Sequence, residues 1–352
     1  MALIKAFVWS RSPNPDIYQN LNNGVDWGTN GNLPDLGSRI GLNISNSNAN
    51  HFVICGSNGA GTDDLIYYSL DNGQTVVQSN ITGNLQSMYV DSRPSIYIND
   101  SAVYISTIEG LYYSGNDGAD FSVVIEYDDP LFDGGTSIPV GNRNYTELYV
   151  NGNYILVGIS TTGSLLPAEI YISPDLGITW TQLDNTLIPA PATTGASNID
   201  GVYCSNDGNT ITVACSVLGN QKVLNSIDGW ANQNTVLSNT NPSTIGTTKK
   251  VFSVVNNTTI YYIFPFNDDN VPVYKSTDSG TNWTLQSSGT ILPPTGGSFS
   301  ANSFYSDTEG FVLIYELHLY YKIIQTNQLN QDVVLHLFRV FIMHSHYEVK
   351  QV

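Results

Sequence analysis

Charged residues are scarce in this sequence, and basic ones are the scarcest. Asp, Glu, Lys and Arg make up 12% of the 352 residues, against roughly 25% in a typical globular chain. Only 12 Lys and Arg stand against 30 Asp and Glu, a formal net charge of −18. Nucleic-acid binding needs a basic face, and binding to an anionic membrane surface needs a polybasic segment. The composition therefore argues against both roles.

Long apolar runs and a disulfide framework are also lacking. No stretch of about 18 apolar residues occurs, so we expect no membrane insertion. The start of the chain has one Lys and a short apolar stretch broken by Trp9, Ser10 and Arg11. It is typical of a β-strand, and no signal peptide is recognisable. The three cysteines are too few for a disulfide framework, and a bridge between Cys204 and Cys215 stays open.

Motifs for the common cofactor-dependent and hydrolytic chemistries are absent. The sequence has no phosphate-binding G-x-x-x-x-G-K-[ST] loop, no dinucleotide fingerprint, no H-E-x-x-H and no Gly-x-Ser-x-Gly. His344 and His346 alternate on an expected strand, but no third metal ligand can be identified. We therefore expect no cofactor and no metal, although Ca²⁺ is compatible with the many acidic loop residues.

What the chain has in abundance is one repeated pattern. It reads Tyr-x-Ser-x-Asp-x-Gly-x-Thr followed by Trp or another apolar residue, in copies that begin at Tyr67, Tyr171 and Tyr274. Looser copies begin at Tyr18 and Tyr112, and a shortened copy begins at Leu224. Successive copies start about fifty residues apart, the length of four short strands with variable loops.

The residue types of the pattern suit a hairpin turn. Gly supplies a positive φ without steric cost. The Asp or Asn oxygen can accept backbone N–H groups across the turn, and the Ser hydroxyl can do the same. We therefore expect a structural role for these residues, which are Asn22, Gly24, Trp27, Ser69, Asp71, Gly73, Ser114, Asn116, Gly118, Ser173, Asp175, Gly177, Trp180, Ser226, Asp228, Trp230, Ser276, Asp278, Gly280 and Trp283.

The pattern resembles the Asp-box, or BNR, repeat of the sialidase-like superfamily, which also occurs in some endoglucanases and xyloglucanases, in sortilin-type receptors and in photosystem assembly factors. The resemblance covers nearly the whole chain. It implies an all-β fold, a single β-propeller domain over residues 1–352 with four-stranded antiparallel blades and Asp-box turns. The repeat is specific for this fold and says little about function, because it braces the blade rather than a ligand site.

The number of apolar strands predicts seven blades, with six as the alternative. Each repeat is preceded by an apolar strand, and a seventh such strand is 311–317. The first blade lacks its innermost strand, which the run 337–346 could supply by pairing the two ends of the chain and closing the ring. Residues 311–352 contain neither Gly nor Pro. This distinct segment is a specialised closing blade, an appended interaction segment or the product of an altered reading frame.

The long connections point to one face as a binding site. In propellers of this kind the Asp-box turns lie on one face and the connections between blades lie on the other. The connections 128–143, 184–197, 236–248 and 286–299 are long, and long loops on a rigid scaffold commonly carry binding residues. Aromatic residues of such loops, including Phe132, Phe264 and Phe266, could stack on sugar rings or be buried beneath their own loops.

Four basic residues are candidates for ligand binding on that face. They are Arg39, Arg93, Arg143 and Lys250, each at or just before an expected innermost strand. A ring of such cations could hold a carboxylate or sulfate. It is similar to the arginine triad of sialidases, although Gly41 stands where the Arg-Ile-Pro signature has Pro. The favoured interpretation is that each cation pairs with a neighbouring acid, since acids outnumber bases.

Together these features favour a non-catalytic propeller, extracellular or on a virion or cell surface, that binds a glycan or a protein partner. One alternative is a sialidase-like glycoside hydrolase, for which the catalytic residues are unknown: no Tyr nucleophile can be nominated, and loop acids such as Asp63 and Asp133 are only candidates. Another is a structural subunit of a virion, fibre or filament, with assembly through residues 311–352.

Overall fold

The computed structural model describes residues 7–9, 17–20, 27–30, 40–44, 50–57, 64–71, 73–82, 95–132, 134–188, 190–193, 195–217, 220–239, 252–254, 258–263, 273–287, 301–306 and 311–315. Over these residues the protein is all-β, and the one helical element in them is the 3₁₀ turn η1 (Val140–Asn142). No helix in this part of the chain is long and apolar enough to cross a membrane. The expected all-β class is confirmed.

The strands form six hydrogen-bonded sheets in the described part of the chain. The first sheet contains β1 (Phe7–Trp9), β2 (Ile17–Asn20) and β3 (Trp27–Asn30). The second contains β4 (Ile40–Ile44), β5 (Phe52–Ser57), β6 (Asp64–Ser69) and β7 (Val77–Gln78). The third contains β8 (Asn80–Thr82), β9 (Ser95–Asn99), β10 (Ala102–Ser106), β11 (Gly110–Ser114) and β12 (Asp120–Glu126).

The largest sheet has eight strands and is followed by two smaller ones. The eight are β13 (Arg143–Asn151), β14 (Tyr154–Ser164), β15 (Glu169–Ser173), β16 (Thr181–Gln182), β17 (Gly195–Cys204), β18 (Ile211–Val217), β19 (Asn220–Ser226) and β20 (Asn234–Asn239). The smaller sheets contain β21 (Phe252–Val254), β22 (Ile260–Ile263), β23 (Val273–Ser276) and β24 (Thr284–Ser287), and then β25 (Ala301–Ser306) and β26 (Phe311–Tyr315).

Within each group of up to four strands, consecutive strands pair antiparallel, so each group is a meander. The eight-stranded sheet consists of two meanders, β13–β16 and β17–β20, that join where Thr161 pairs with Ser197 and Ser164 with Gly195. One pairing is parallel: β8 runs along β12, the outer strand of the next meander, from Asn80 opposite Asp120. The chain thereby fastens one meander to the next at the outer edge.

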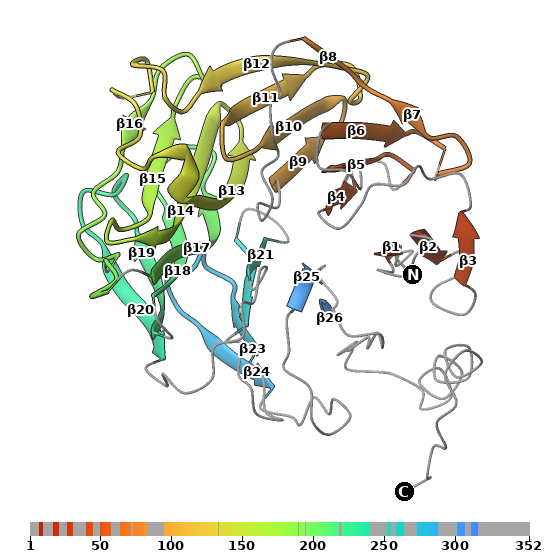
Figure 1. Ribbon diagram of the computed structural model, residues 1–352. Helices are drawn as coiled ribbons and strands as arrows, with labels where there is room; N and C mark the ends of the chain where they lie inside the picture. Colours follow the sequence, from red (N-terminus) through yellow and green to blue (C-terminus); the bar gives the residue numbers. More distant parts are fainter. Residues whose placement is uncertain are drawn as a thin grey trace, which may run out of the picture.

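The meanders stand around a central axis with their first strands innermost, as Figure 1 shows. The inner strands contact one another in the order β4, β9, β13, β17, β21 and β25. Side chains alternate along each strand, and the apolar ones fill the space between successive meanders. Three clusters result, around Val53 and Ile96, around Leu148 and Tyr171, and around Ile199 and Leu224.

Several finer expectations lie beyond what the structure describes. The run 337–346 is outside the described residues, and the hydrogen-bonded sheets of the described part do not close into a ring. Cys204 and Cys215 are both free and buried, so the bridge between them does not form. The register explains this, since Cys204 lies opposite Ile211 while Cys215 lies opposite Ile199.

The repeated turn connects the third and fourth strands of a meander, and five copies share one hydrogen-bond pattern. The Ser hydroxyl donates to the side chain two residues later at 2.8 or 2.9 Å and accepts the N–H four residues later at 2.7 to 3.0 Å. The side-chain oxygen of that Asp or Asn accepts the N–H of the residue six positions after the Ser, at 2.8 to 3.0 Å. The acceptor is Asp71, Asn116, Asp175, Asp228 or Asp278.

The copy that begins at Leu224 and contains Ser226 differs from the expectation. The turn is not shortened. Trp230 takes the place of the glycine, with a φ of 78°. The turn keeps its full length, because Asn232, six residues after Ser226, still donates its N–H to Asp228. A left-handed conformation disfavours a residue with a Cβ atom. The indole offsets this by lying in the core and donating from Nε1 to the Asp184 carbonyl at 2.7 Å.

Each of these turns also braces its surroundings. The N–H of Leu176 donates to the carbonyl of Asn153, in the turn between the first and second strands of the same meander, at 2.9 Å. Gly177 has a φ of 97°, and a Cβ atom there would lie 2.4 Å from Val124 of the preceding meander. The repeated turn therefore packs closely on its neighbour, which leaves little room for a side chain at the glycine position.

Replacing the turn's serine should therefore be costly, while exchanging its acid for an amide should not. Ser173→Ala leaves buried backbone N–H groups without an acceptor, and we expect a loss of about 1–3 kcal/mol in the free energy of unfolding. Asp175→Asn should stay near wild type, because Asn116 already fills that position in another copy. Urea unfolding of both variants measures the difference. Equal destabilisation by the two would contradict the shared hydrogen-bond pattern.

Candidate binding face

The antiparallel topology separates two faces of the molecule. The repeated turns and the turns between first and second strands lie on one face, since their backbones are hydrogen-bonded to each other, as with Gly229 N–H and Asn209 O at 2.8 Å. The remaining connections must then lie at the opposite ends of the strands. We call this opposite side the loop face; its described parts are residues 107–110, 127–132, 134–142, 165–168, 183–188 and 190–193.

The connection from β12 to β13 dominates the loop face and is built on an aromatic core. Phe132 is fully buried and stacks on Tyr171 with ring centroids 4.0 Å apart. It also meets Tyr127 at 4.8 Å and Trp180 at 4.9 Å. Phe132 is thus buried beneath its own loop and does not offer its ring to a sugar. Phe264 and Phe266 lie outside the described residues.

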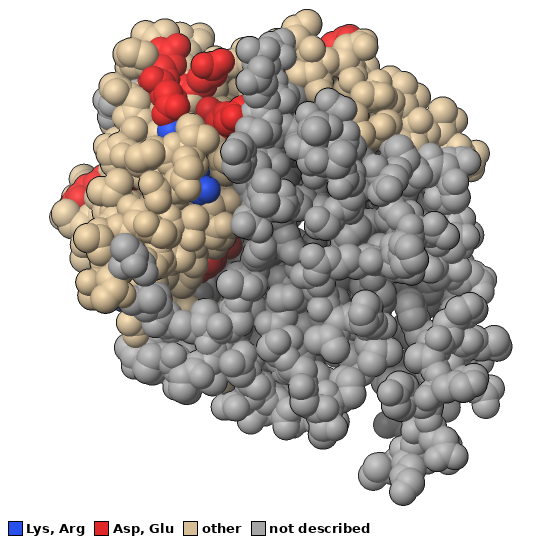
Figure 2. All heavy atoms as spheres, in the orientation of Figure 1, with Lys and Arg blue, Asp and Glu red and all other residues tan. Residues whose placement is uncertain are grey.

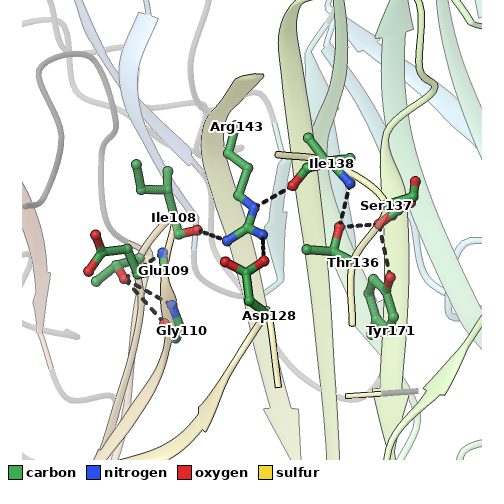
Figure 3. A network of polar contacts seen from close by, with 11 residues as sticks. Ile108, Glu109, Gly110, Asp128, Thr136, Ser137, Ile138, Arg143 and Tyr171 are labelled. Carbon is green, nitrogen blue, oxygen red and sulfur yellow. Dashed lines mark hydrogen bonds and ion pairs between the residues drawn. The ribbon is translucent and has the colours of Figure 1, made fainter. Parts of the chain in front are cut away.

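Arg143 fixes the base of this connection, as Figure 3 shows. Its Nε donates to the Ile138 carbonyl at 2.9 Å and its Nη1 to the Ile108 carbonyl at 2.8 Å. Its Nη2 makes an ion pair with Asp128. The Arg143 side chain is 0% exposed and that of Asp128 is 63% exposed. The guanidinium therefore bridges the connection to the β10–β11 turn.

A buried carboxylate supplies a second anchor. Both Thr136 and Ser137 donate their hydroxyls to Glu169, at the start of β15, and Tyr171 donates its hydroxyl to Glu169 Oε2 at 2.9 Å. Three hydroxyl donors stabilise the buried charge in place of a counter-ion. A third anchor is Asn142, whose Nδ2 donates to the carbonyls of Thr162 and Gly163 in the last part of β14. The connection is held at its base from three directions.

The tips of the loops remain open to solvent. Leu131 is 71% exposed, and Leu165 in the neighbouring β14–β15 connection is also exposed. Glu126 and Asp128 are exposed beside Leu131. Figure 2 shows acidic side chains gathered near β12, with little basic surface beside them. The described part of the loop face therefore combines apolar tips with negative charge.

A second buried acid, Asp200, lies on inner strand β17. Its Oδ1 accepts a hydrogen bond from the Tyr145 hydroxyl of β13 at 3.0 Å. Burial raises the pKa of Asp200 to about 6, and burial together with the Asp200 charge raises the pKa of Tyr145 well above its usual value. Sequence reasoning did not single out Glu169 or Asp200. The signal available was an acid within an otherwise apolar strand.

The inner strands also carry an aromatic row. Tyr149 meets Tyr97 with ring centroids 5.7 Å apart and Tyr203 at 5.3 Å. Burial raises the pKa of Tyr97 to about 12. The row places these tyrosines at one level.

The remaining candidates are distributed as follows. Arg39, Arg93 and Lys250 lie outside the described residues, as do Asn22 and Gly24, and Trp27 begins β3. Arg143 has three of its five N–H groups engaged by the protein, and its role in ligand binding stays a prediction. Within the described residues no group of three His, Cys, Asp or Glu side chains is placed to hold a metal ion.

Comparison with solved structures defines the class of fold. The GH74 enzyme of Niastella koreensis aligns with a TM-score of 0.50 and 17% identity over 80% of this chain, but over only 44% of its own length. YCF48 bound to D1 peptide aligns with a TM-score of 0.53 and 10% identity, over 89% of this chain and 88% of its own. A PL25 ulvan lyase aligns with a TM-score of 0.52 and 12% identity, over 88% and 86%.

These similar structures are β-propellers, and this chain has a β-propeller fold. No family model and no curated protein sequence matches it. The chain spans less than half the length of the GH74 enzyme. At identities of 10–17% the likeness concerns the fold, and one propeller fold can carry many functions.

Removing the Arg143 side chain should loosen the loop face. Arg143→Met leaves the carbonyls of Ile138 and Ile108 buried without donors, and we expect a loss of about 2–5 kcal/mol in the free energy of unfolding. Asp128→Asn should cost much less, because that carboxylate is mostly in water. Urea unfolding with tryptophan fluorescence measures both. A similar loss in the two variants would mean that the ion pair, and not the carbonyl contacts, carries the stability.

Proposed function

We propose that this chain is a non-catalytic propeller that binds a glycan or a protein partner through the loop face. The observation that carries the proposal is the β12–β13 connection, whose base is anchored by Arg143 and Glu169 while Leu131 at its tip is exposed. A loop already held in one conformation loses little entropy on binding. The buried positions of Arg143 and Phe132 favour a structural role for both over direct ligand contact.

We propose further that the architecture is a seven-bladed Asp-box (BNR) propeller of the sialidase-like superfamily, closed by pairing of its N- and C-terminal strands. Six strands of the described part follow an innermost strand in their sheet, namely β5, β10, β14, β18, β22 and β26, and we propose β1 as the seventh, with its innermost partner supplied by the run 337–346. The shared hydrogen bonds of the repeated turns support the assignment to the Asp-box repeat.

The setting we propose is extracellular, or the surface of a virion or cell. Its support is compositional: neutral polar residues and tyrosine provide most of the polar surface, and the net charge of −18 disfavours nucleic acid. Similar folds include enzymes named for polysaccharides, the GH74 enzyme and the ulvan lyase, and YCF48, which is seen with a peptide. Glycan and protein partners are both within the range of the fold.

A sialidase-like glycoside hydrolase is the second candidate, favoured by the hydrogen bond between Tyr145 and Asp200. A Tyr nucleophile must lose its proton during the reaction, whereas burial raises the pKa of Tyr145. This phenol is therefore not activated in the structure. Turnover of a fluorogenic sialoside that disappears in Arg39→Ala would establish the enzyme in place of the binding protein.

The binding function can be tested with two matched surface variants. Leu131, 71% exposed, lies on the loop face, and Ile178, 78% exposed, lies in a repeated turn on the opposite face. On a glycan array and in partner pull-downs we expect Leu131→Asp to weaken binding at least tenfold, because it adds charge to a contact surface. Ile178→Asp should bind as the wild-type chain does.

The opposite ranking of the two variants would place the partner on the face of the repeated turns and refute the proposal. Hydrolysis of a sialoside or β-glucan by the same sample would move the protein to the enzyme class. Circular dichroism and thermal unfolding of both variants provide the folding control.

A further inference from the structure

Three buried oxygen atoms on strands β17 and β19 have no hydrogen-bond partner in the described part of the protein. They are Asn198 Oδ1, Asp200 Oδ2 and Gln221 Oε1. Asp200 is 5% exposed and Gln221 is 6% exposed. An unpaired buried polar atom costs about 1–3 kcal/mol, and more when it carries charge. Three together call for a common physical reason.

The three side chains surround one residue, Ser216. Asn198 and Gln221 lie directly opposite Ser216 on the two neighbouring strands, so the three side chains share one side of the sheet. Asn198 Nδ2 donates to Ser216 Oγ at 3.3 Å. Ser216 also makes a side-chain hydrogen bond with Asp200. Each residue with an unpaired oxygen is thus a contact or a cross-strand neighbour of this serine.

All three unpaired atoms are acceptors, one carboxylate and two amide oxygens. Two donors near these atoms are engaged elsewhere: Tyr145 donates to the other oxygen of Asp200 at 3.0 Å, and Asn198 Nδ2 donates to Ser216. One water has two protons for three acceptors. Carboxylate and amide oxygens are the ligands that hard cations take in proteins, and a single cation can satisfy all three.

We propose that Asn198, Asp200 and Gln221 form a binding site for a hard cation, of which Ca²⁺ is the representative. The three oxygens supply part of the six to eight ligands of Ca²⁺, and water supplies the rest. The single carboxylate implies weak binding, with Kd on the order of 10⁻⁴–10⁻³ M as in extracellular modules. Only one ligand is acidic, so a pattern of clustered His, Cys, Asp and Glu does not reveal the site.

The bound ion would lie beside the junction of two meanders. Asp200 belongs to β17, and its carboxylate is also held by Tyr145 of β13. Binding to the folded chain alone raises the folding equilibrium constant by the factor 1 + [ion]/Kd. At ten times the Kd this is about elevenfold. The site therefore stabilises the junction between β13–β16 and β17–β20, at the ends of β18 and β19 opposite to the repeated turns.

The test uses the full chain, treated with EGTA and dialysed, and then titrated with Ca²⁺ in calorimetry and thermal unfolding. We expect saturable binding and a rise in Tm for the wild-type chain. Asp200→Asn should remove both effects. This variant should fold, because a neutral amide avoids burying an unpaired charge. Gln221→Glu adds a carboxylate ligand and should tighten binding by about tenfold.

Asp207→Asn is the matched control, since Asp207 follows the same strand, is exposed and is engaged by Ser205 and Asn209 in its own turn. It should keep the Ca²⁺ response of the wild-type chain. No heat and no Tm shift up to about twenty times the expected Kd would overturn the proposal. So would an unchanged response in Asp200→Asn, because the ion would then bind elsewhere. Neither result bears on glycan or partner binding.

Discussion

The fold depends on how the repeated turn satisfies its own backbone. Two consecutive residues adopt positive φ in this turn, as Leu176 and Gly177 do, and their N–H groups donate to the Asn153 carbonyl and to Ser173 Oγ. The Ser hydroxyl and the neighbouring Asp or Asn oxygen accept the N–H groups that would otherwise be left unpaired. A turn whose N–H groups have acceptors can pack against the preceding meander, where a Cβ atom at Gly177 would lie 2.4 Å from Val124.

The connections on the two faces of the molecule therefore have different roles. One face is committed to bracing, because its turns are short, internally bonded and in contact with neighbouring meanders. The other face is free to carry long connections, and the β12–β13 connection is organised by Arg143 and Glu169. Both charged groups are used as hydrogen-bonding hubs for the backbone or for hydroxyls. At Arg143 and Glu169, charged groups therefore stabilise the conformation of the connection.

The comparison of expectation and structure is instructive at Trp230 and Arg143. The pattern around Ser226 was interpreted as a shortened turn because tryptophan normally ends the repeat, whereas Trp230 occupies the glycine position. Spacing could not reveal this, since a core site for the indole must exist to offset its positive φ. Arg143 was a candidate for ligand binding, although pairing with a neighbouring acid was the favoured interpretation. Its partner Ile108 lies in the β10–β11 turn and its partner Asp128 in the β12–β13 connection.

The all-β class, the positions of most strands and the locations of the turns were determined by the sequence alone, because they follow from local periodicity and from short-range hydrogen bonds within about seven residues. Contacts between distant segments were decided only by the tertiary structure. Phe132 became part of the core, Glu169 gained its hydroxyl donors, and Asp200 met Tyr145. Each depends on which meanders become neighbours, and packing of whole sheets sets that.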